Sequence, residues 1–134
     1  MHQGQNFQIL LLQIERYGFA TDKKIDVTNY KYLKCVLDVS ISKYNSVEAN
    51  NTDGNAEVDI GLYNSTTDGF HDNALKAHAR IDYGEAGGSA TNTTMTLDVS
   101  NITGSYYICF QAHANLNAYN AEIDAKIYRI YLQR

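Results

Sequence analysis

The stretch from Lys31 to Lys43 reads KYLKCVLDVSISK and gives the clearest indication of the fold. Apolar side chains stand at every second position, and polar side chains fill most of the positions between them. Because successive side chains of a β-strand point to opposite faces, this pattern predicts a strand with one buried and one solvent-facing side. The residues on the predicted buried side are Leu33, Cys35, Leu37, Val39 and Ile41.

The same alternation recurs along most of the chain, and Gly, Asn, Asp and Ser cluster between the alternating stretches. There is no proline, and no segment of about ten or more residues has helical periodicity. The sequence therefore predicts an all-β fold of about seven or eight strands. Strands are expected at 7–15, 31–43, 57–62, 75–83, 94–99, 106–113 and 122–132, with a glycine-rich turn at 84–89.

Loop lengths and strand patterns together indicate the architecture. The predicted loops Asn45–Asn55 and Asn64–Asn73 are long for hairpins, so we expect strands to cross between two sheets. This favours a two-sheet antiparallel β-sandwich of the jelly-roll type over an up-and-down barrel. In the last predicted strand the apolar positions shift by one residue between Ile127 and Ile130, which predicts a β-bulge.

The length of 134 residues and a composition of 44% hydrophobic and 19% charged residues are typical of one domain covering residues 1–134. Residues 1–24 have two interpretations. The run Ile9–Leu12 is apolar on both faces, so this strand either inserts into the sandwich or acts as an arm that pairs with another chain. Tyr128 and Tyr131 likewise either cover an interface or pack over the open end of the core.

Charge and hydropathy exclude two classes of partner. The net charge is −4, and the 11 Lys and Arg residues are scattered, with Lys23-Lys24 as the only adjacent pair. Binding to a phosphate backbone needs clustered cations, so nucleic acid is not an expected partner. The apolar run at 9–12 is too short for a signal-peptide core or a membrane span, so no membrane insertion is expected.

The two cysteines, Cys35 and Cys109, are expected to remain unpaired. If Ile108 and Phe110 point into the core, Cys109 points away from it, whereas Cys35 faces inward. A disulfide is the alternative if the strand that carries Cys109 is buried on both faces.

Three segments carry a family resemblance: Ile25–Lys34 (IDVTNYKYLK), Leu97–Ile108 (LDVSNITGSYYI) and Ile127–Leu132 (IYRIYL). Together they resemble the jelly-roll modules in tail and minor structural proteins of phages from Gram-positive bacteria, an architecture that carbohydrate-binding modules share. The resemblance implies a virion structural module of the tail, fibre or capsid-decoration type, located on the virion or an extracellular surface. It would act through self-assembly and host-surface attachment, with copies of itself or other virion proteins as partners.

The alternative function is a carbohydrate-binding module that recognises cell-surface glycans. Sugar sites combine aromatic rings with hydrogen-bonding side chains, and two predicted outward stripes supply both if their strands share a sheet. The stripes contribute the candidates His78, Arg80, Tyr107, Gln111 and His113; the plain alternative is a solvated sheet face. Trp, the commonest stacking platform, is absent. Further candidates near loops, as stacking platforms or loop anchors, are Tyr44, Tyr63, Phe70 and Tyr119.

One stretch has the composition of a cation site. Oxygen-bearing side chains stand at every second position in Asn51, Asp53, Asn55, Glu57 and Asp59. In a loop they would converge on calcium, which takes about six to eight oxygen ligands, whereas in a strand the same spacing forms only a polar face. Apart from this calcium alternative no cofactor is expected, because the four histidines lack metal-ligand spacing.

We expect no enzymatic activity and no catalytic residues. The sequence lacks the G-x-S-x-G, H-E-x-x-H and P-loop patterns. The carboxylates that a glycosidase would pair each alternate with apolar neighbours, as solvent-facing strand positions do. These carboxylates are Asp59, Asp82, Asp98 and Asp124.

Overall fold

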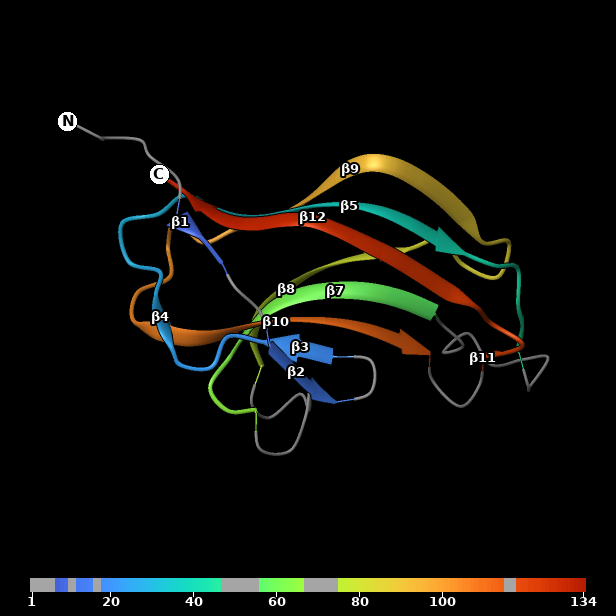
Figure 1. Ribbon diagram of the computed structural model, residues 1–134, viewed down its shortest axis with the longest axis horizontal. Coiled ribbons are helices and arrows are strands. Elements are labelled where there is room, and N and C mark those ends of the chain that lie inside the picture. The colour runs from blue at the N-terminus through green and yellow to red at the C-terminus, as the bar shows by residue number, and fades with distance from the viewer. Residues whose placement is uncertain (1–6, 10–11, 16–17, 47–55, 67–74, 115–117) are drawn as a thin grey trace.

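The computed structural model describes residues 7–9, 12–15, 18–46, 56–66, 75–114 and 118–134 (Figure 1). Eight strands have three or more residues: β2 (Leu12–Glu15), β3 (Gly18–Ala20), β5 (Tyr32–Ile41), β7 (Ala56–Tyr63), β8 (Leu75–Asp82), β9 (Gly88–Asp98), β10 (Ser105–Ala114) and β12 (Ile123–Gln133). Four strands have two residues: β1 (Phe7–Gln8), β4 (Ile25–Asp26), β6 (Asn45–Ser46) and β11 (Ala118–Tyr119). Across these ranges no helix is long and apolar enough to cross a membrane.

The strands form two sheets that lie face to face (Figure 1). The smaller sheet has the order β1-β12-β5-β9, and the larger sheet has the order β2-β3-β10-β7-β8, with β4 also paired to β10. A short third pair joins β6 to β11, and all pairs are antiparallel. The predicted two-sheet antiparallel β-sandwich is therefore confirmed.

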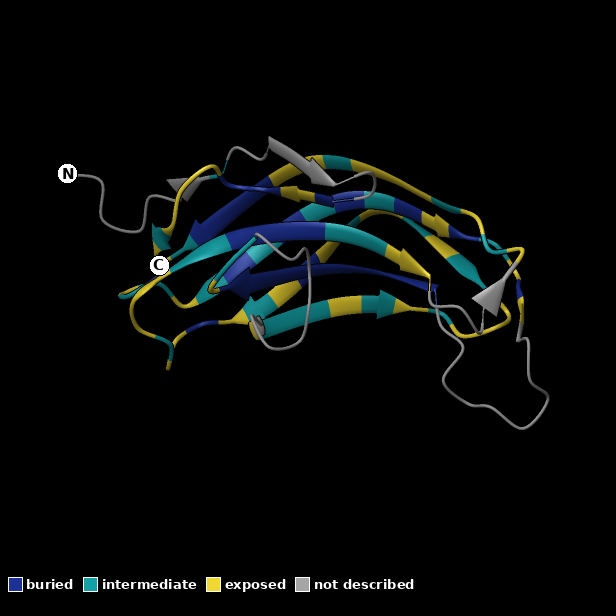
Figure 2. Cartoon of the chain, turned by 90° about the horizontal axis from the view of Figure 1, so that it is seen from below, coloured by how far each residue is buried: buried dark blue, intermediate teal, exposed yellow. Residues whose placement is uncertain are grey.

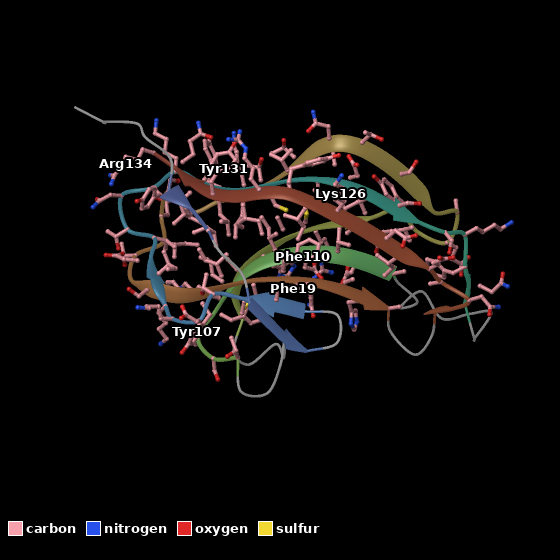
Figure 3. All side chains as sticks on the ribbon, viewed as in Figure 1. Phe19, Tyr107, Phe110, Lys126, Tyr131 and Arg134 are labelled. Carbon is pink, nitrogen blue, oxygen red and sulfur yellow. The ribbon has the colours of Figure 1, made fainter. Side chains whose placement is uncertain are left out.

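The core lies between the two sheets and contains the stripe that the sequence predicts. All five side chains of the β5 stripe are at most 2% exposed. The larger sheet contributes Val58, Ile60 and Leu62 from β7, together with Ile108 and Phe110 from β10. Phe110 points into the space between the sheets in Figure 3, and buried residues, dark blue in Figure 2, follow the central strands.

The chain crosses repeatedly between the sheets, as expected for a jelly-roll sandwich. The connections from β5 to β7, β8 to β9, β9 to β10 and β10 to β12 each lead from one sheet to the other. The loop predicted at Asn45–Asn55 lies in the first of these crossings. The loop at Asn64–Asn73 instead joins β7 to its direct neighbour β8, so the inference from loop length was wrong there.

Two strands differ from their predicted extent. The first predicted strand is divided, since β1 pairs with β12 in the smaller sheet and β2 pairs with β3 in the larger one. β9 begins at Gly88, inside the predicted glycine-rich turn, and its polar first half still pairs with β5. Because β9 is an edge strand, much of its surface meets solvent, so its residues there need not alternate in polarity.

The predicted β-bulge lies in β12, where the register against β5 shifts between Ile127 and Arg129. The extra residue is Tyr128, whose hydroxyl donates a hydrogen bond of 2.6 Å to Asp38 Oδ2. On the other side of β5, the Asn92 backbone N–H donates to Asp38 Oδ1 at 2.7 Å. Asp38 therefore connects the bulge of β12 with an irregularity in β9.

Neither cysteine forms a disulfide, and both are buried, on different faces of the fold. Cys35 belongs to the core between the sheets, and burial raises the pKa of its thiol to about 12. Cys109 lies on the outer side of the larger sheet, where it packs with Ala20 and Tyr63. The prediction that the two thiols point away from each other is confirmed.

Candidate ligand-binding face

The outer side of the larger sheet gathers the two polar stripes that the sequence predicts. β10 and β8 share this sheet, but β7 lies between them. Asp59 of β7 stands in one row with Arg80 of β8 and Gln111 of β10, and Glu57 stands in the next row beside His113. We call the surface formed by Glu57, Asp59, His78, Arg80, Tyr107, Gln111 and His113 the polar face.

The two carboxylates at the centre of the polar face are buried, which corrects an expectation from the sequence. Asp59 was expected in a solvent-facing position, yet Glu57 and Asp59 are only 4% and 3% exposed. β7, which lies between β10 and β8, is buried at every residue, including those on its outer side. Two acidic groups therefore lie out of water on the outer side of a sheet.

Arg80 compensates both buried carboxylates. Its Nη1 lies 3.3 Å from Glu57 Oε2, and its Nε lies 3.3 Å from Asp59 Oδ1. Neither contact has hydrogen-bond geometry, and these two oxygens have no hydrogen-bond partner among the described residues. The Arg80 side chain remains 45% exposed, so the guanidinium lies over the acids and also faces solvent.

A short hydrogen-bond network extends from this centre to both neighbouring strands. Arg80 Nη2 donates to His78 Nε2 at 2.7 Å, because a guanidinium has no acceptor. Gln111 Nε2 donates to Asp59 Oδ2 at 3.5 Å, which is a long contact. These contacts hold the polar side chains of His78, Arg80 and Gln111 next to one another on the outer side of the larger sheet.

Burial controls the protonation of Asp59. Loss of solvation, followed by the neighbouring charge of Glu57, raises the pKa of Asp59 to about 7. Arg80 and the Gln111 hydrogen bond act in the opposite direction and do not cancel this effect. Near pH 7 Asp59 is therefore partly protonated, since burial and an adjacent carboxylate both disfavour its charged form.

Aromatic and small apolar side chains border the polar face at one end. Tyr107 stands opposite Tyr63 in the register of β10 and β7, and both pack with Ala20 and Cys109. Tyr63 is 3% exposed, whereas Tyr107 is only half-buried and keeps an accessible ring. Figure 3 shows Tyr107 on the side of β10 away from Phe110. Tyr107 is the aromatic residue best placed to contact a ligand on this face.

The remaining candidates from the sequence have different positions. Tyr44 is 2% exposed and belongs to the core, which is the loop-anchor alternative. Phe70 lies outside the described residues, and only the backbone of Tyr119 is described, in β11. The structure therefore brings together the sheet candidates and leaves the loop candidates apart from them.

The calcium candidates are divided between described and undescribed parts of the chain. Asn51, Asp53 and Asn55 lie outside the described residues, while Glu57 and Asp59 lie in β7 and face Arg80. Within the described ranges, no three His, Cys, Asp or Glu side chains form a group that could hold a metal ion.

Sequence reasoning missed the burial of Glu57 and Asp59, although the chain contains one signal. Gly61 continues their stripe on β7, and a glycine inside a strand often marks close approach of neighbouring groups. A Cβ at this position would lie 2.8 Å from Tyr63 Cε2 and 3.1 Å from the Ala77 carbonyl oxygen. This face of β7 is therefore closely covered.

Comparisons with known proteins do not assign the chain to a family. No protein-family model matches the sequence, and a search of curated proteins found no matching relative.

Proposed function

We propose that the chain is a non-enzymatic attachment module of a virion surface, and that its polar face binds cell-surface polysaccharide. Jelly-roll sandwiches serve both as virion domains and as lectins, which fits the resemblance of three sequence segments to phage structural modules. Fold alone is a weak basis for function, so the proposal depends mainly on the side chains of the polar face.

The observation that carries the proposal is the pair of buried carboxylates beneath Arg80. Burial of two acids costs stability even when a cation compensates them, and sequences accept such costs mainly at functional sites. Here the acids hold a half-exposed guanidinium in place, with His78 and Gln111 beside it. Fixed donors and acceptors in one layer match the hydroxyl groups of a sugar, and Tyr107 offers a ring for its apolar side.

Binding is a better match than hydrolysis. A glycosidase needs two carboxyl groups that flank the scissile bond with about 5 Å or more between them. Glu57 and Asp59 are instead buried side by side and turned toward Arg80, so they orient the guanidinium and do not face an open cleft.

The test is a binding screen on an array of purified cell-wall polysaccharides from Gram-positive bacteria. Gln111→Ala and His113→Ala each remove a solvent-accessible side chain of the polar face and leave the ion pairs of Arg80 in place. We expect each variant to bind the polysaccharide about tenfold more weakly. Thr96→Ala, an exposed position on the smaller sheet, is the matched control and should bind like the wild type.

Three results would contradict this function. The first is the absence of binding to every polysaccharide, and the second is equal loss in Thr96→Ala and Gln111→Ala. The third is shortening of the bound polysaccharide, detected by mass spectrometry, since that would make the protein an enzyme.

A further inference from the structure

β12 is an edge of the smaller sheet over the first half of its length. It pairs with β5 on one side, whereas on its other side β1 reaches only as far as Ile130, whose carbonyl accepts the Ile9 N–H at 2.8 Å. No described residue pairs with the outer edge of Ile123–Arg129. An unpaired strand edge presents N–H and C=O groups on which another strand can assemble.

The hydrogen bonds to β5 show which backbone groups are free. The Ser42 N–H donates to the Glu122 carbonyl at 2.9 Å, so the backbone of Glu122 faces β5. Backbone groups of successive residues point alternately to the two sides of a strand, and the register from 123 to 127 is regular. The N–H and C=O groups of Ile123, Ala125 and Ile127 therefore point to the free edge.

The same three residues form an apolar stripe that remains incompletely covered. Their neighbours on β5, at positions 37, 39 and 41, are at most 2% exposed. On β12, in contrast, Ile123 and Ile127 are half-buried and Ala125 is exposed. The core of the sandwich is thus open along this edge.

Two hollows follow the open edge. One of about 560 Å³ lies between Gln111–Ala114 of β10 and Ala121–Asp124 of the β12 end. Another of about 230 Å³ is bordered by Ile9, Phe19 and Ile127–Ile130. Phe19 and Tyr128, beside the second hollow, are 37% and 48% exposed and are the large hydrophobic residues most open to solvent in the described part of the chain.

We infer that a second copy of this chain pairs with this edge, antiparallel, with a two-fold axis at Ala125. Ala125 then lies opposite Ala125 of the second copy, Ile123 opposite Ile127, and Asp124 opposite Lys126. Each pair whose backbone groups face the free edge exchanges two hydrogen bonds, about six in total. The smaller sheet becomes continuous across the two chains, and the apolar stripes of both copies close their open sides.

Charge complementarity points to a second copy and fixes this register. Asp124 and Lys126 are both exposed, and the axis at Ala125 makes two opposite-charge pairs between the copies. An axis at Asp124 or at Lys126 would instead place two like charges directly opposite each other, which is destabilising. The proposed pairs also fit within the free part of the edge, because β12 begins at Ile123 and β1 occupies the edge from Ile130 onward.

The dimer specifies the self-assembly that the proposed virion role requires. Its backbone pairs lie on β12 of the smaller sheet, whereas the polar face lies on the larger sheet. The first measurement is the molar mass of the full chain in solution by light scattering. We expect a dimer of twice 15.0 kDa, which is 30.0 kDa. Ala125→Pro removes an N–H that has no hydrogen-bond partner among the described residues, so it should fold normally and be a monomer. The same variant separates the dimer proposal from the polysaccharide proposal, since each monomeric chain should still bind polysaccharide as a wild-type chain does.

Charge reversal tests the register. Asp124→Lys and Lys126→Asp each replace two attractive pairs with two repulsive ones, and each should weaken dimerisation about tenfold or more. The double variant D124K/K126D exchanges the partners and should restore the dimer. Lys76→Asp, an exposed position on β8, changes the net charge as Lys126→Asp does and should leave the dimer intact.

A cross-link gives a direct view of the axis. Two residues paired across the axis have Cα atoms about 5.5 Å apart, within disulfide range. Ala125→Cys should therefore form a covalent dimer on mild oxidation, whereas Thr96→Cys should not. A wild-type chain that is monomeric at millimolar concentration would overturn the inference. A dimer that survives Ala125→Pro and both single reversals, without cross-linking at position 125, would also overturn it.

Discussion

Asp59 shows at the scale of one residue how the polar face affects stability. Its folded pKa is raised to about 7, chiefly by burial and then by Glu57, above the ordinary value of 3.8. In the window between these values the folded state binds more protons than the unfolded state, so its stability falls as pH rises from about 4 to about 7. Below that window the contribution is fully present.

The corresponding prediction concerns Asp59→Asn, which resembles the protonated side chain and cannot ionise. Between pH 4.5 and 7.5 the wild type should lose at least about 1.4 kcal/mol more of its free energy of unfolding than the variant does. This amount is the equivalent of one pKa unit. Urea unfolding at three pH values measures this. All other titratable groups are present in both proteins, so their contributions largely cancel in the difference.

Asp98→Asn is the control for this pH dependence. The Ser100 side chain and then its backbone N–H lower the pKa of Asp98, so the contribution of Asp98 is present above 3.8 and lost only as pH falls below that value. Between pH 4.5 and 7.5 Asp98→Asn should follow the wild type. If the free energy of unfolding of Asp59→Asn changes with pH as steeply as that of the wild type, Asp59 ionises normally in the folded protein.

For single residues, the sequence predicted which side chains belong to the polar face and which side of the sheet they point to. It did not predict how deeply each side chain is buried. The alternation at 76–82 and 107–113 placed His78, Arg80, Gln111 and His113 on outward stripes, and the structure brings them onto one face. The burial of Asp59 depends on which strands flank β7. Strand order results from pairings between distant residues, and no local pattern contains it.

The turn from β8 to β9 carries the chain from the larger sheet to the smaller one and depends on two glycines in the left-handed region. Gly84 has φ +68° and Gly87 has φ +72°, and the Gly87 N–H donates to the Gly84 carbonyl at 3.1 Å. The surroundings of the two residues differ. A Cβ at Gly84 would meet nothing within 4 Å, whereas one at Gly87 would lie within 2.7 Å of backbone atoms of Ser42 and Lys43.

Alanine at these two positions should therefore have unequal effects. Gly84→Ala introduces only the cost of the left-handed backbone, and we expect a loss of about 1 kcal/mol in the free energy of unfolding. Gly87→Ala adds a collision with backbone that cannot move aside, so we expect a loss of about 3 kcal/mol or more. Chemical denaturation of both variants measures the difference. Equal losses would mean that the connection after β5 can shift to make room.

Strands with a buried stripe were predictable from sequence, and strands determined by pairing were not. β5 alternates clearly because one of its sides packs in the core, where β10 places Ile108 and Phe110. The first half of β9 has no such pattern, since an edge strand requires only a partner for its backbone groups. The bulge in β12 was predictable because the shift in apolar positions at Tyr128 is a local property of the sequence.

For the whole molecule, the sandwich is closed unevenly. β1 extends the smaller sheet beside Leu132, and β3 and β2 extend the larger sheet beside Cys109, while β12 from Ile123 to Arg129 remains an edge (Figure 1). The sequence suggested that the first strand either inserts or pairs with another chain. In the structure its described parts pair within the chain, and the last strand keeps an edge that no described residue pairs with.

Pairing of this edge links the stability of the fold to protein concentration. If two chains unfold from one dimer, mass action raises the thermal midpoint with concentration, because association stabilises only the folded state. With typical unfolding entropies for two chains of this length, each tenfold increase should raise the midpoint by about 2–3 °C. Calorimetry of the wild type and Ala125→Pro over a hundredfold range tests this. The thermal midpoint of the variant should not change with concentration. If the midpoint of the wild type does not change either, the edge does not assemble in the folded protein.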